Sequence, residues 1–412
     1  MERAVKNLVI LLAAYSGFTQ AASITGLGYL YDDIPPQPIS PLVLNPTPEL
    51  IDSLGYIATV TAVSGDGGIL AGRSSGELSN YVEGFIYSQD NLERIIDGSE
   101  SISVNGLSRD GSVATGIRST SNGHEAFIYQ DGNVIGLGDL AGGTFSSIGR
   151  GISEDGSVVV GSAWSASGRE GFVYQNGEMT GLGDLPGGSF SSSANDVSAD
   201  GTTIVGEGRS ENGDEAFIYR DGQMAGLGSL VPGAGSEATA VSADGQVVVG
   251  TSSTYDGREA FFYLEGEMHG LGDLPYEIYG GYGSDSGALD VSADGSTIVG
   301  YGSSRYSVFS REAAIWTADG SGGYILESLA NRLLLLGIDA QAEGWANLYE
   351  ATSVSDDGLI ITGFGLREGK TEAFLINLNS AAVPVPGAIL LFISALAMLG
   401  LRKRFQEVNC SQ

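Results

Sequence analysis

One tetrapeptide pattern, Ser-x-Asp-Gly, occurs seven times in the sequence of 412 residues, with similar residues on both sides of it. Its aspartates are Asp66, Asp110, Asp155, Asp200, Asp244, Asp294 and Asp357. Their successive spacings are 44, 45, 45, 44, 50 and 63 residues. A period near 45 residues indicates one supersecondary unit that is copied along the chain. The chain is therefore predicted to adopt a repeat architecture.

Each copy contains four short runs that are typical of strands, separated by Gly, Asp or Asn. In the third copy the runs are residues 147–152, 157–161, 169–174 and 178–185. Asp155-Gly156 separates the first two runs, and Asn176-Gly177 separates the last two. Tight hairpin turns need positive φ, which these residues tolerate. Each copy is predicted to be a four-stranded antiparallel meander.

The two ends of the chain indicate how the copies are arranged. A sheet of about 45 residues cannot bury both of its faces alone, so the copies must pack on one another. This predicts an all-β, seven-bladed β-propeller of four-stranded blades. The seventh copy stops after its third strand, 372–376, whereas the fourth-strand motif Gly-Leu-Gly-x-Leu precedes the first copy at 26–30. We expect residues 24–30 to complete the last blade and close the ring; an open β-solenoid or linear array would not need these ends.

Two segments interrupt the repeat. Residues 32–50 contain six prolines and are expected to form a stiff crossing to the first blade. Residues 326–345 lie between the sixth and seventh copies, and their apolar spacing predicts a short helix. We expect this insertion to lie on one face of the propeller, as a cap or as part of a binding surface.

The first 22 residues have the features of a secretory signal peptide. Arg3 and Lys6 precede an apolar run at 8–14, and small residues follow at Ala21 and Ala22. Cleavage is expected after one of these alanines. The propeller is then predicted to comprise residues 23–379.

Residues 380–412 have three parts: a short proline motif, an apolar stretch that ends at Leu401, and a basic cluster. The motif and cluster are Val383, Pro384, Val385, Pro386, Gly387, Arg402, Lys403 and Arg404. The apolar part is long enough to span a bilayer, with the basic cluster on the cytoplasmic side. The segment resembles the PEP-CTERM sorting signal of Gram-negative bacteria, which implies processing by an exosortase. It departs from that signal at Val385, where glutamate is usual, and in its longer tail; a plain membrane anchor is the alternative.

The repeats themselves resemble the HAF-repeat proteins, described as probable extracellular repeats. The matching motifs are Glu-Ala-Phe-Ile-Tyr at Glu215, Gly-Leu-Gly-Asp-Leu-Pro-Gly-Gly at Gly181 and Ser-Ala-Asp-Gly at Ser198. The resemblance extends over residues 24–378. It implies export and a repeat-type β architecture, and it implies no catalytic activity.

Composition agrees with an exported protein that avoids polyanions. The formal net charge is −31, which disfavours binding to nucleic acid and favours solubility or cation binding. The single cysteine, Cys410, lies beyond the apolar stretch, so the exported domain would have no disulfide.

Repeated carboxylates are the first candidates for a site. One glutamate precedes the third strand of every copy: Glu83, Glu125, Glu170, Glu215, Glu259, Glu312 and Glu372. These seven could bind Ca²⁺ or a sugar, but a position present in every copy is expected to accept backbone hydrogen bonds at the blade junction. The Ser-x-Asp-Gly aspartates could likewise bind Ca²⁺, and turn formation explains them sufficiently. We therefore predict no cofactor, with Ca²⁺ as the open alternative.

Aromatic residues form a second group. The alternating Phe and Tyr of the third strands, such as Phe172 and Tyr174, are expected to point to one side into an inter-blade core. Tyr276, Tyr279 and Tyr282 lie in a glycine-rich loop after the fifth copy and are candidates for stacking on carbohydrate. The alternative is that they are ordinary loop residues.

The sequence contains few motifs that are typical of an enzyme. Residues 72–76 match Gly-x-Ser-x-Gly, but no helix is predicted to follow, as a nucleophile elbow requires. His124 and His269, the only histidines, occupy different places in their copies. A glycosidase or lyase that uses only carboxylates is the remaining enzymatic alternative.

These observations predict a non-catalytic exported protein. It would be sorted by an exosortase, anchored transiently in the inner membrane, and placed in the cell envelope, on the outer surface or in the extracellular matrix of a Gram-negative bacterium. Exopolysaccharide or envelope proteins are its expected partners. A glycosidase or lyase acting on exopolysaccharide and a calcium-dependent adhesin are the alternatives.

Overall fold

A computed structural model describes residues 22–26, 57–75, 82–88, 91–275, 284–303 and 311–379. Residues 23–377 form one compact unit of the chain, and the remaining residues at the two ends form a second. The predicted signal peptide, the proline-rich crossing and the sorting segment lie outside the described residues. The second unit is therefore represented only by Ala22, Leu378 and Asn379.

The described chain is all-β apart from one short helix. We number the repeat units by their Ser-x-Asp-Gly tetrads. Unit 1 comprises β2 (Ile57–Val63), β3 (Ile69–Ser75), β4 (Val82–Ser88) and β5 (Asn91–Ile95). Unit 2 comprises β6 (Ser101–Leu107), β7 (Val113–Thr120), β8 (Gly123–Gln130) and β9 (Asn133–Gly138). Unit 3 comprises β10 (Gly142–Ile152), β11 (Val158–Ser165), β12 (Gly168–Gln175) and β13 (Glu178–Gly181).

The later units follow the same order. Unit 4 comprises β14 (Gly187–Val197), β15 (Ile204–Ser210), β16 (Gly213–Arg220) and β17 (Gln223–Gly228). Unit 5 comprises β18 (Ser236–Val241), β19 (Val248–Thr254), β20 (Gly257–Leu264) and β21 (Glu267–Gly272), and is followed by β22 (Ser284–Asp285). Unit 6 comprises β23 (Gly287–Val291), β24 (Thr297–Ser303), β25 (Arg311–Ala318) and β26 (Tyr324–Ser328). Unit 7 comprises β27 (Trp345–Val354), β28 (Ile360–Arg367) and β29 (Lys370–Asn377), with β1 (Ser23–Gly26).

Consecutive strands within each unit pair antiparallel, which confirms the predicted meander. The tight turns between the third and fourth strands have the predicted chemistry. Asp131, Asn176, Asp221 and Glu265 all have positive φ, between 51° and 55°, and each precedes a glycine with positive φ. These are the φ values that a two-residue hairpin turn needs. Turn residues therefore set the register of each unit.

The first strand of every unit contains a β-bulge three residues before the tetrad serine. In unit 3, Gly149 pairs with Gly161 and Gly151 with Val160, so Arg150 has no partner in the ladder. The second strand passes so close to the first at this point that a Cβ on Gly161 would lie 1.9 Å from the carbonyl oxygen of Ile148. Equivalent glycines in the other units meet the same obstacle. The bulge therefore explains the Gly found in every second strand.

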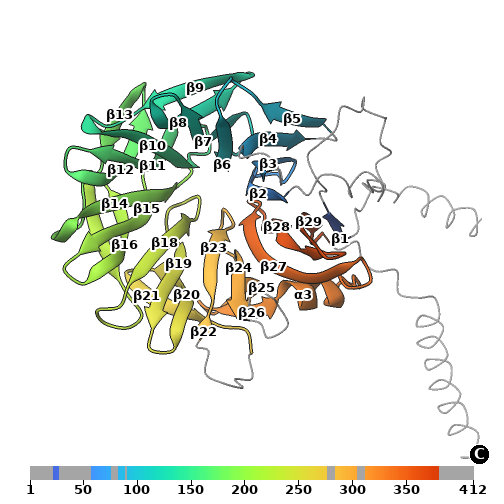
Figure 1. Ribbon diagram of the computed structural model, residues 1–412. Coiled ribbons are helices and arrows are strands. Elements are labelled where there is room, and N and C mark those ends of the chain that lie inside the picture. Colours follow the sequence, from blue (N-terminus) through green and yellow to red (C-terminus); the bar gives the residue numbers. More distant parts are fainter. Residues whose placement is uncertain are drawn as a thin grey trace, which may run out of the picture. The chain divides into compact units, whose positions relative to one another are not determined.

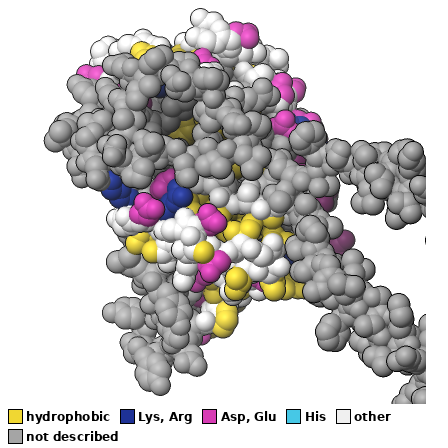
Figure 2. All heavy atoms as spheres, turned by 90° about the vertical axis from the view of Figure 1, so that its right-hand side faces the viewer, with side chains coloured by type: hydrophobic (Ala, Val, Ile, Leu, Met, Phe, Trp, Pro, Cys, Tyr) yellow, Lys and Arg dark blue, Asp and Glu magenta, His cyan; other side chains and the backbone are white. Residues whose placement is uncertain are grey.

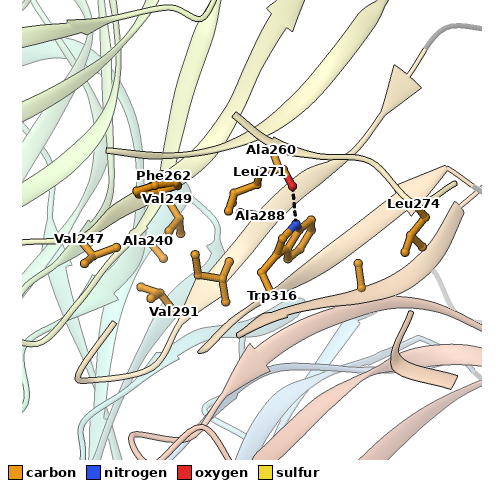
Figure 3. Packing of buried hydrophobic residues seen from close by; sticks show 12 residues of the cluster. Ala240, Val247, Val249, Ala260, Phe262, Leu271, Leu274, Ala288, Val291 and Trp316 are labelled. Carbon is orange, nitrogen blue, oxygen red and sulfur yellow. Dashed lines mark hydrogen bonds between the residues drawn. The ribbon is translucent and has the colours of Figure 1, made fainter. Parts of the chain in front are cut away.

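Neighbouring units bury their apolar faces against each other. Figure 3 shows one such cluster, which combines Phe262 and Val249 of unit 5 with Trp316 and Ala288 of unit 6. The indole nitrogen of Trp316 donates to the carbonyl oxygen of Leu271 across the junction, at 3.0 Å. The third-strand phenylalanines of units 2 to 5 are completely buried in equivalent clusters. The prediction of an aromatic inter-unit core is confirmed.

The ends of the repeat array meet. In Figure 1 the units follow one another around a common centre, and β1 lies beside β29. β1 pairs antiparallel with β29, from Ser23 opposite Asn377 to Gly26 opposite Phe374. The predicted closing strand is confirmed for these residues, while Leu27 to Leu30 lie outside the described part of the chain. An open array would leave that edge of β29 unpaired.

Backbone hydrogen bonds link the tetrads in a complete circle. Each amide of the residue after the tetrad serine donates to the carbonyl oxygen of its counterpart in the next unit, at 2.8 to 3.2 Å. The order is Gly65, Arg109, Glu154, Ala199, Ala243, Ala293, Asp356 and again Gly65. The last of these bonds joins units 7 and 1, which are far apart in sequence, so the described residues form a closed β-propeller-like ring.

The insertion after unit 6 contains the predicted helix, α3 (Leu329–Leu335). Ser328 caps its first turn by accepting a hydrogen bond from the amide of Asn331. Leu329 and Leu333 are buried, and Gly337 follows the helix with φ of 85°. No helix among the described residues is long and apolar enough to cross a membrane. The predicted spanning helix belongs to the C-terminal segment, outside those residues.

Candidate functional site

The tetrad aspartates hold turns together. In every unit, the serine hydroxyl donates to the aspartate Oδ1 at 2.6 to 2.9 Å, and the amide two residues after the aspartate donates to the same oxygen at 2.8 to 3.0 Å. The serines are at most 1% exposed. In units 1, 3 and 4 these amide hydrogen bonds, followed by those of hydroxyl groups, lower the pKa of Asp66, Asp155 and Asp200. These contacts are those of a turn.

The repeated glutamates accept hydrogen bonds within their own units. Glu125, Glu170, Glu215 and Glu259 each accept from the second glycine amide of the following Gly-Leu-Gly, at 3.0 to 3.2 Å. A Cβ on the first glycine of that motif would lie 2.2 to 2.3 Å from the same carboxylate. Gly26 of the closing strand stands in the same relation to Glu372. The glutamate and Gly-Leu-Gly are thus two halves of one structural contact.

A cavity of about 250 Å³ lies at the centre of the ring. Every unit lines it with the same four positions: the three residues before the tetrad serine and the residue after it. The first three positions lie on the inner strands β2, β6, β10, β14, β18, β23 and β27, and the fourth lies in the tetrad turn that follows each of them. Three of these four positions carry charged side chains in some units and small or neutral ones in others, so the cavity is the main candidate site.

At the bulge position, most units have a side chain that ties neighbours together. Thr61, Asn105, Asn195, Thr239 and Thr352 each donate to a backbone carbonyl of the next unit, at 2.7 to 2.9 Å. Unit 3 has Arg150 at this position, and unit 6 has Leu289. Neither of these side chains makes that hydrogen bond among the described residues. The scaffold therefore tolerates departures at two places in the cavity wall.

Arg150 brings a guanidinium into this inner region. Its Nε is buried and has no hydrogen-bond partner among the described residues. Burial and the nearby charge of Arg169 lower the pKa of Arg150, whereas Glu237 and Glu207 oppose that shift. Asn195 also reaches Glu237, at 3.2 Å, and Arg169 lies 3.6 Å from Glu207. A cluster of mixed charge therefore surrounds the junction of units 3, 4 and 5.

The residue after the bulge position is an aspartate in two units, Asp196 in unit 4 and Asp290 in unit 6. The other five units have Ala, Gly or Ser there. An Oδ2 atom of Asp196 accepts from the amide of Val241 at 2.9 Å. Asp290 accepts from the amide of Val354 and the hydroxyl of Ser353, both at 2.8 Å. Burial raises the pKa of Asp196 to about 7, and the charge of Asp290 adds to the shift. Burial likewise raises the pKa of Asp290 to about 6, against its hydrogen bonds.

A third group lies at the mouth of the cavity, on the residue after the tetrad serine. Arg109 contacts Glu154 of the next unit at 2.5 Å and Asp356 of unit 7 at 2.6 Å. It reaches Asp356 over Gly65, where a Cβ would lie 2.5 Å from the arginine side chain. The other units have alanine at this position. The three charges therefore form one ionic bridge over unit 1.

Exposed aromatic side chains gather at one end of units 3, 4 and 5. Trp164, Phe190 and Tyr255 are 46%, 37% and 90% exposed. Trp164 and Tyr255 lie at hairpins between second and third strands, and Phe190 adjoins Gly168 of such a hairpin. The predicted carbohydrate candidates Tyr276, Tyr279 and Tyr282 lie outside the described residues. The loop that carries them returns at Ser284, which pairs with Gly257 beside the Tyr255 hairpin.

The surface elsewhere mixes acidic and apolar groups. Figure 2 shows Asp and Glu side chains interspersed with hydrophobic ones on the described part of one face. Leu334 and Leu335 of α3 are 60% and 73% exposed, and Ile325 of β26 is 55% exposed. Single exposed apolar residues are normal for a soluble surface.

The remaining residues considered from the sequence, Ser74, His124 and His269, lie in three different units. Ser74 of the Gly-x-Ser-x-Gly match lies inside β3, paired with Glu83 in the ladder. His124 lies on β8 beside Ser119, whereas His269 stacks on Phe262 in unit 5. Within the described ranges, no group of three or more His, Cys, Asp or Glu side chains could hold a metal ion.

Arg150, Asp196 and Asp290 were not among the residues predicted from the sequence. Alignment of the seven tetrads would have shown that charge appears only in some copies at these positions. That they line one cavity follows from the bulge and the ring.

Comparisons show similarity of fold only. No protein-family model matches the chain, and no curated protein matches it. TolB from Agrobacterium tumefaciens is 15% identical over 66% of this chain and 90% of that chain, with a TM-score of 0.42. Oligogalacturonate lyase from Vibrio parahaemolyticus is 8% identical over 87% and 97% of the two chains, with a TM-score of 0.49. The β-propeller domain of the Trilobed protease from Pyrococcus furiosus is 16% identical over 66% and 81%, with a TM-score of 0.43.

Proposed function

We propose that this chain is a non-catalytic, exported protein of the cell envelope or extracellular matrix, built on a closed seven-bladed β-propeller. The circle of seven backbone hydrogen bonds and the pairing of β1 with β29 support this blade number and its closure. The repeated aspartates and glutamates support a structural role, because each described contact ties a turn or a strand. The propeller then acts through its surfaces.

The exposed aromatic end of units 3 to 5 carries the proposal of polymer binding. Trp164, Phe190 and Tyr255 are exposed on the consecutive units 3, 4 and 5. Ser284, which follows the segment with Tyr276, Tyr279 and Tyr282 in the sequence, pairs with Gly257 beside the Tyr255 hairpin. Aromatic rings offer large, rigid contact area with a low entropy cost on binding. A neutral or weakly charged exopolysaccharide suits this surface better than a polyanion, because the chain carries a net charge of −31.

Calorimetric titration tests this proposal. The full-length chain is titrated with exopolysaccharide of the producing cells, and the Trp164→Ala/Tyr255→Ala variant is compared with Ile135→Ala, an exposed apolar residue on β9. Loss of two aromatic contacts is expected to weaken binding about tenfold. Equal affinity of the two variants would place binding elsewhere. Shortening of the polymer during the titration would replace the proposal by a glycosidase or lyase, and binding lost only with chelator would favour a calcium-dependent adhesin.

Export and sorting form a separate part of the proposal, supported by the sequence of the two ends. We propose that residues 1–22 direct export and that residues 380–412 are an exosortase substrate, with the inner membrane as a transient location. The Pro384→Ala/Pro386→Ala variant is expected to accumulate uncleaved in the inner membrane, as followed by fractionation. Unchanged processing of this variant would leave a plain anchor as the better account.

A further inference from the structure

The residue before the repeated glutamate lies near the start of the third strand, at the same end of the unit as the exposed aromatic side chains. It is Arg169 in unit 3, Asp214 in unit 4, Arg258 in unit 5 and Arg311 in unit 6. The scaffold does not require arginine here, because units 1, 2 and 7 have Val, His and Thr. The three arginines therefore depart from the repeat, in a chain whose net charge is −31.

Arg311 has a structural role. Its guanidinium contacts the carboxylates of Asp285 and Glu350, both at 2.8 Å. Its Cζ also lies 3.9 Å from the centre of the Tyr301 ring. A guanidinium held by two carboxylates and a ring has little capacity left for a ligand. Arg311 is therefore not part of the proposed site.

Arg258 and Arg169 keep most of their hydrogen-bonding capacity free. Arg258 is exposed, and its guanidinium makes no ion pair or hydrogen bond with the described residues. It lies opposite Ser253 in the hairpin that carries Tyr255. Arg169 is 33% exposed, and its ion pair with Glu207 is 3.6 Å long. Charge-assisted hydrogen bonds to carboxylates measure about 2.7–2.9 Å, so this contact leaves the N–H donors of Arg169 largely unused.

These arginines lie next to exposed aromatic side chains. Trp164 and Arg169 are directly opposite each other in the antiparallel pairing of β11 and β12, so their side chains lie on the same side of the sheet. Arg169 also pairs with Ser191, the residue after Phe190, on the neighbouring unit. An aromatic ring stacks on the apolar face of a sugar, and a guanidinium binds a carboxylate with two hydrogen bonds. The combination suits a sugar that carries a carboxylate.

Acidic side chains limit how much negative charge such a ligand can bring. In unit 4 the equivalent position is Asp214, which holds Arg209 at 2.9 Å. Glu211 and Asp256 are exposed on the hairpins of units 4 and 5. Carboxylates on every sugar would be repelled by these groups. Carboxylates separated by neutral sugars would instead meet the arginines of units 3 and 5 and pass over unit 4.

We propose that the exposed aromatic end of units 3 to 5 recognises an exopolysaccharide in which carboxylate-bearing sugars are separated by neutral ones. Trp164 and Tyr255 stack on sugar rings, and Arg169 and Arg258 bind the carboxylates. This inference rests on the proposed polymer-binding function and specifies the weakly charged class of polymer named there.

The direct test compares the exopolysaccharide of the producing cells before and after chemical reduction of its carboxyl groups to hydroxymethyl groups. The reduction keeps the sugar rings and linkages and removes the charge. Calorimetry on the full-length chain is expected to show at least about tenfold weaker binding of the reduced polymer. Binding of the native polymer is also expected to weaken between about 50 mM and about 500 mM salt, because salt screens exposed charges.

The Arg169→Gln/Arg258→Gln variant tests the arginines, and Arg73→Gln is the matched control, since Arg73 is an exposed arginine on β3 of unit 1. The double variant is expected to bind the native polymer at least about tenfold more weakly, and the control less than about twofold. Its affinity for the reduced polymer is expected to equal that of the parent protein, because the aromatic side chains remain. Arg258→Gln alone, with an expected loss of about threefold, is used if loss of the contact with Glu207 disturbs folding.

The outcomes separate this inference from the function on which it rests. Equal affinity of the parent protein for native and reduced polymer would overturn the inference and leave polymer binding in place. Equal affinity of the double variant and the control for the native polymer would do the same for the two arginines. Absence of binding to both polymers would contradict the proposed polymer-binding function itself.

Discussion

Aspartate occurs in two regions of this molecule with opposite electrostatic consequences. At the tetrad turns, Asp66, Asp155 and Asp200 accept amide and hydroxyl hydrogen bonds near solvent, and their pKa is lowered. On the cavity wall, burial raises the pKa of Asp196 to about 7 and that of Asp290 to about 6. The turn aspartates recur in every unit and the cavity aspartates in only two. Repetition thus marks residues that maintain the scaffold, and departure from repetition marks the candidate site.

The largest effect on stability is expected at the bulge, because it leads into the tetrad turn and also forms the cavity wall. The Gly161→Val variant would place its Cβ about 1.9 Å from the carbonyl oxygen of Ile148, opposite the bulge that carries Arg150. We expect the free energy of unfolding to fall by about 3 kcal/mol or more, because backbone must move. Chemical denaturation measures the change. Gly235→Ala is the control, since its nearest neighbour would be 3.5 Å away; equal loss in both variants would contradict the close-approach explanation.

A smaller loss of stability is expected from a change in the tetrad turn of unit 4. Ser198→Ala removes the buried hydroxyl that donates to Asp200 and accepts from the amide of Thr203 at 3.0 Å. An unsatisfied buried amide costs about 1–3 kcal/mol. We expect the denaturation midpoint to fall accordingly. A variant as stable as the parent protein would show that the tetrad serine is dispensable for the turn.

The dependence of stability on pH separates the two kinds of aspartate. Because the pKa of Asp196 and Asp290 is raised in the folded state, their contribution to stability is complete below 3.8 and is lost as the pH rises through about 6 to about 7. The Asp196→Asn/Asp290→Asn variant is therefore expected to lose less stability than the parent protein between about pH 5 and pH 8.

The turn aspartates have the opposite sign. Since the pKa of Asp155 is lowered, its contribution is present above 3.8 and is lost as the pH falls through its folded-state value. Asp155→Asn is accordingly expected to change only the acid side of the same profile. If the stability of the Asp196→Asn/Asp290→Asn variant and that of the parent protein changed in parallel with pH near neutrality, the electrostatic distinction between the two regions would be wrong.

The smallest effect is expected at an exposed ion pair. Arg209 and Asp214 lie 2.9 Å apart, and more than half of each side chain is exposed. Solvent screens such pairs. Arg209→Ala is expected to leave the denaturation midpoint unchanged within error at both low and high salt. A salt-dependent loss would show that charge outside the two regions also maintains the ring.

Much of the fold could be predicted from local patterns, because its elements depend on neighbouring residues. Turn residues such as Asn176-Gly177 adopt the positive φ that their chemistry favours. The alternation of Phe172 and Tyr174 indicates one buried side of a strand, as found. The closing strand could be predicted because residues 26–30 repeat the fourth-strand motif, which the seventh copy lacks. The structure places Gly26 of this strand opposite Phe374 and beside Glu372.

The candidate site could not be predicted in the same way. Asp196 and Asp290 are separated by 94 positions in the chain, and nothing local distinguishes them from exposed aspartates. The raised pKa of both groups arises mainly from burial, with a contribution from the charge of Asp290 at Asp196 and of Asp356 at Asp290. These causes depend on how the units meet. The bulge adds to the difficulty, because it changes which residues of the first strand reach the cavity.

The sequence by itself determined the repeat, the four strands of each unit and the residues that close the array, since these depend on turn chemistry and on the periodic burial of apolar side chains. Only the tertiary structure decided which side chains share the central cavity and in what electrostatic environment. The physical reason is that desolvation and Coulomb interaction act between groups brought together by ring closure, whatever their distance along the chain.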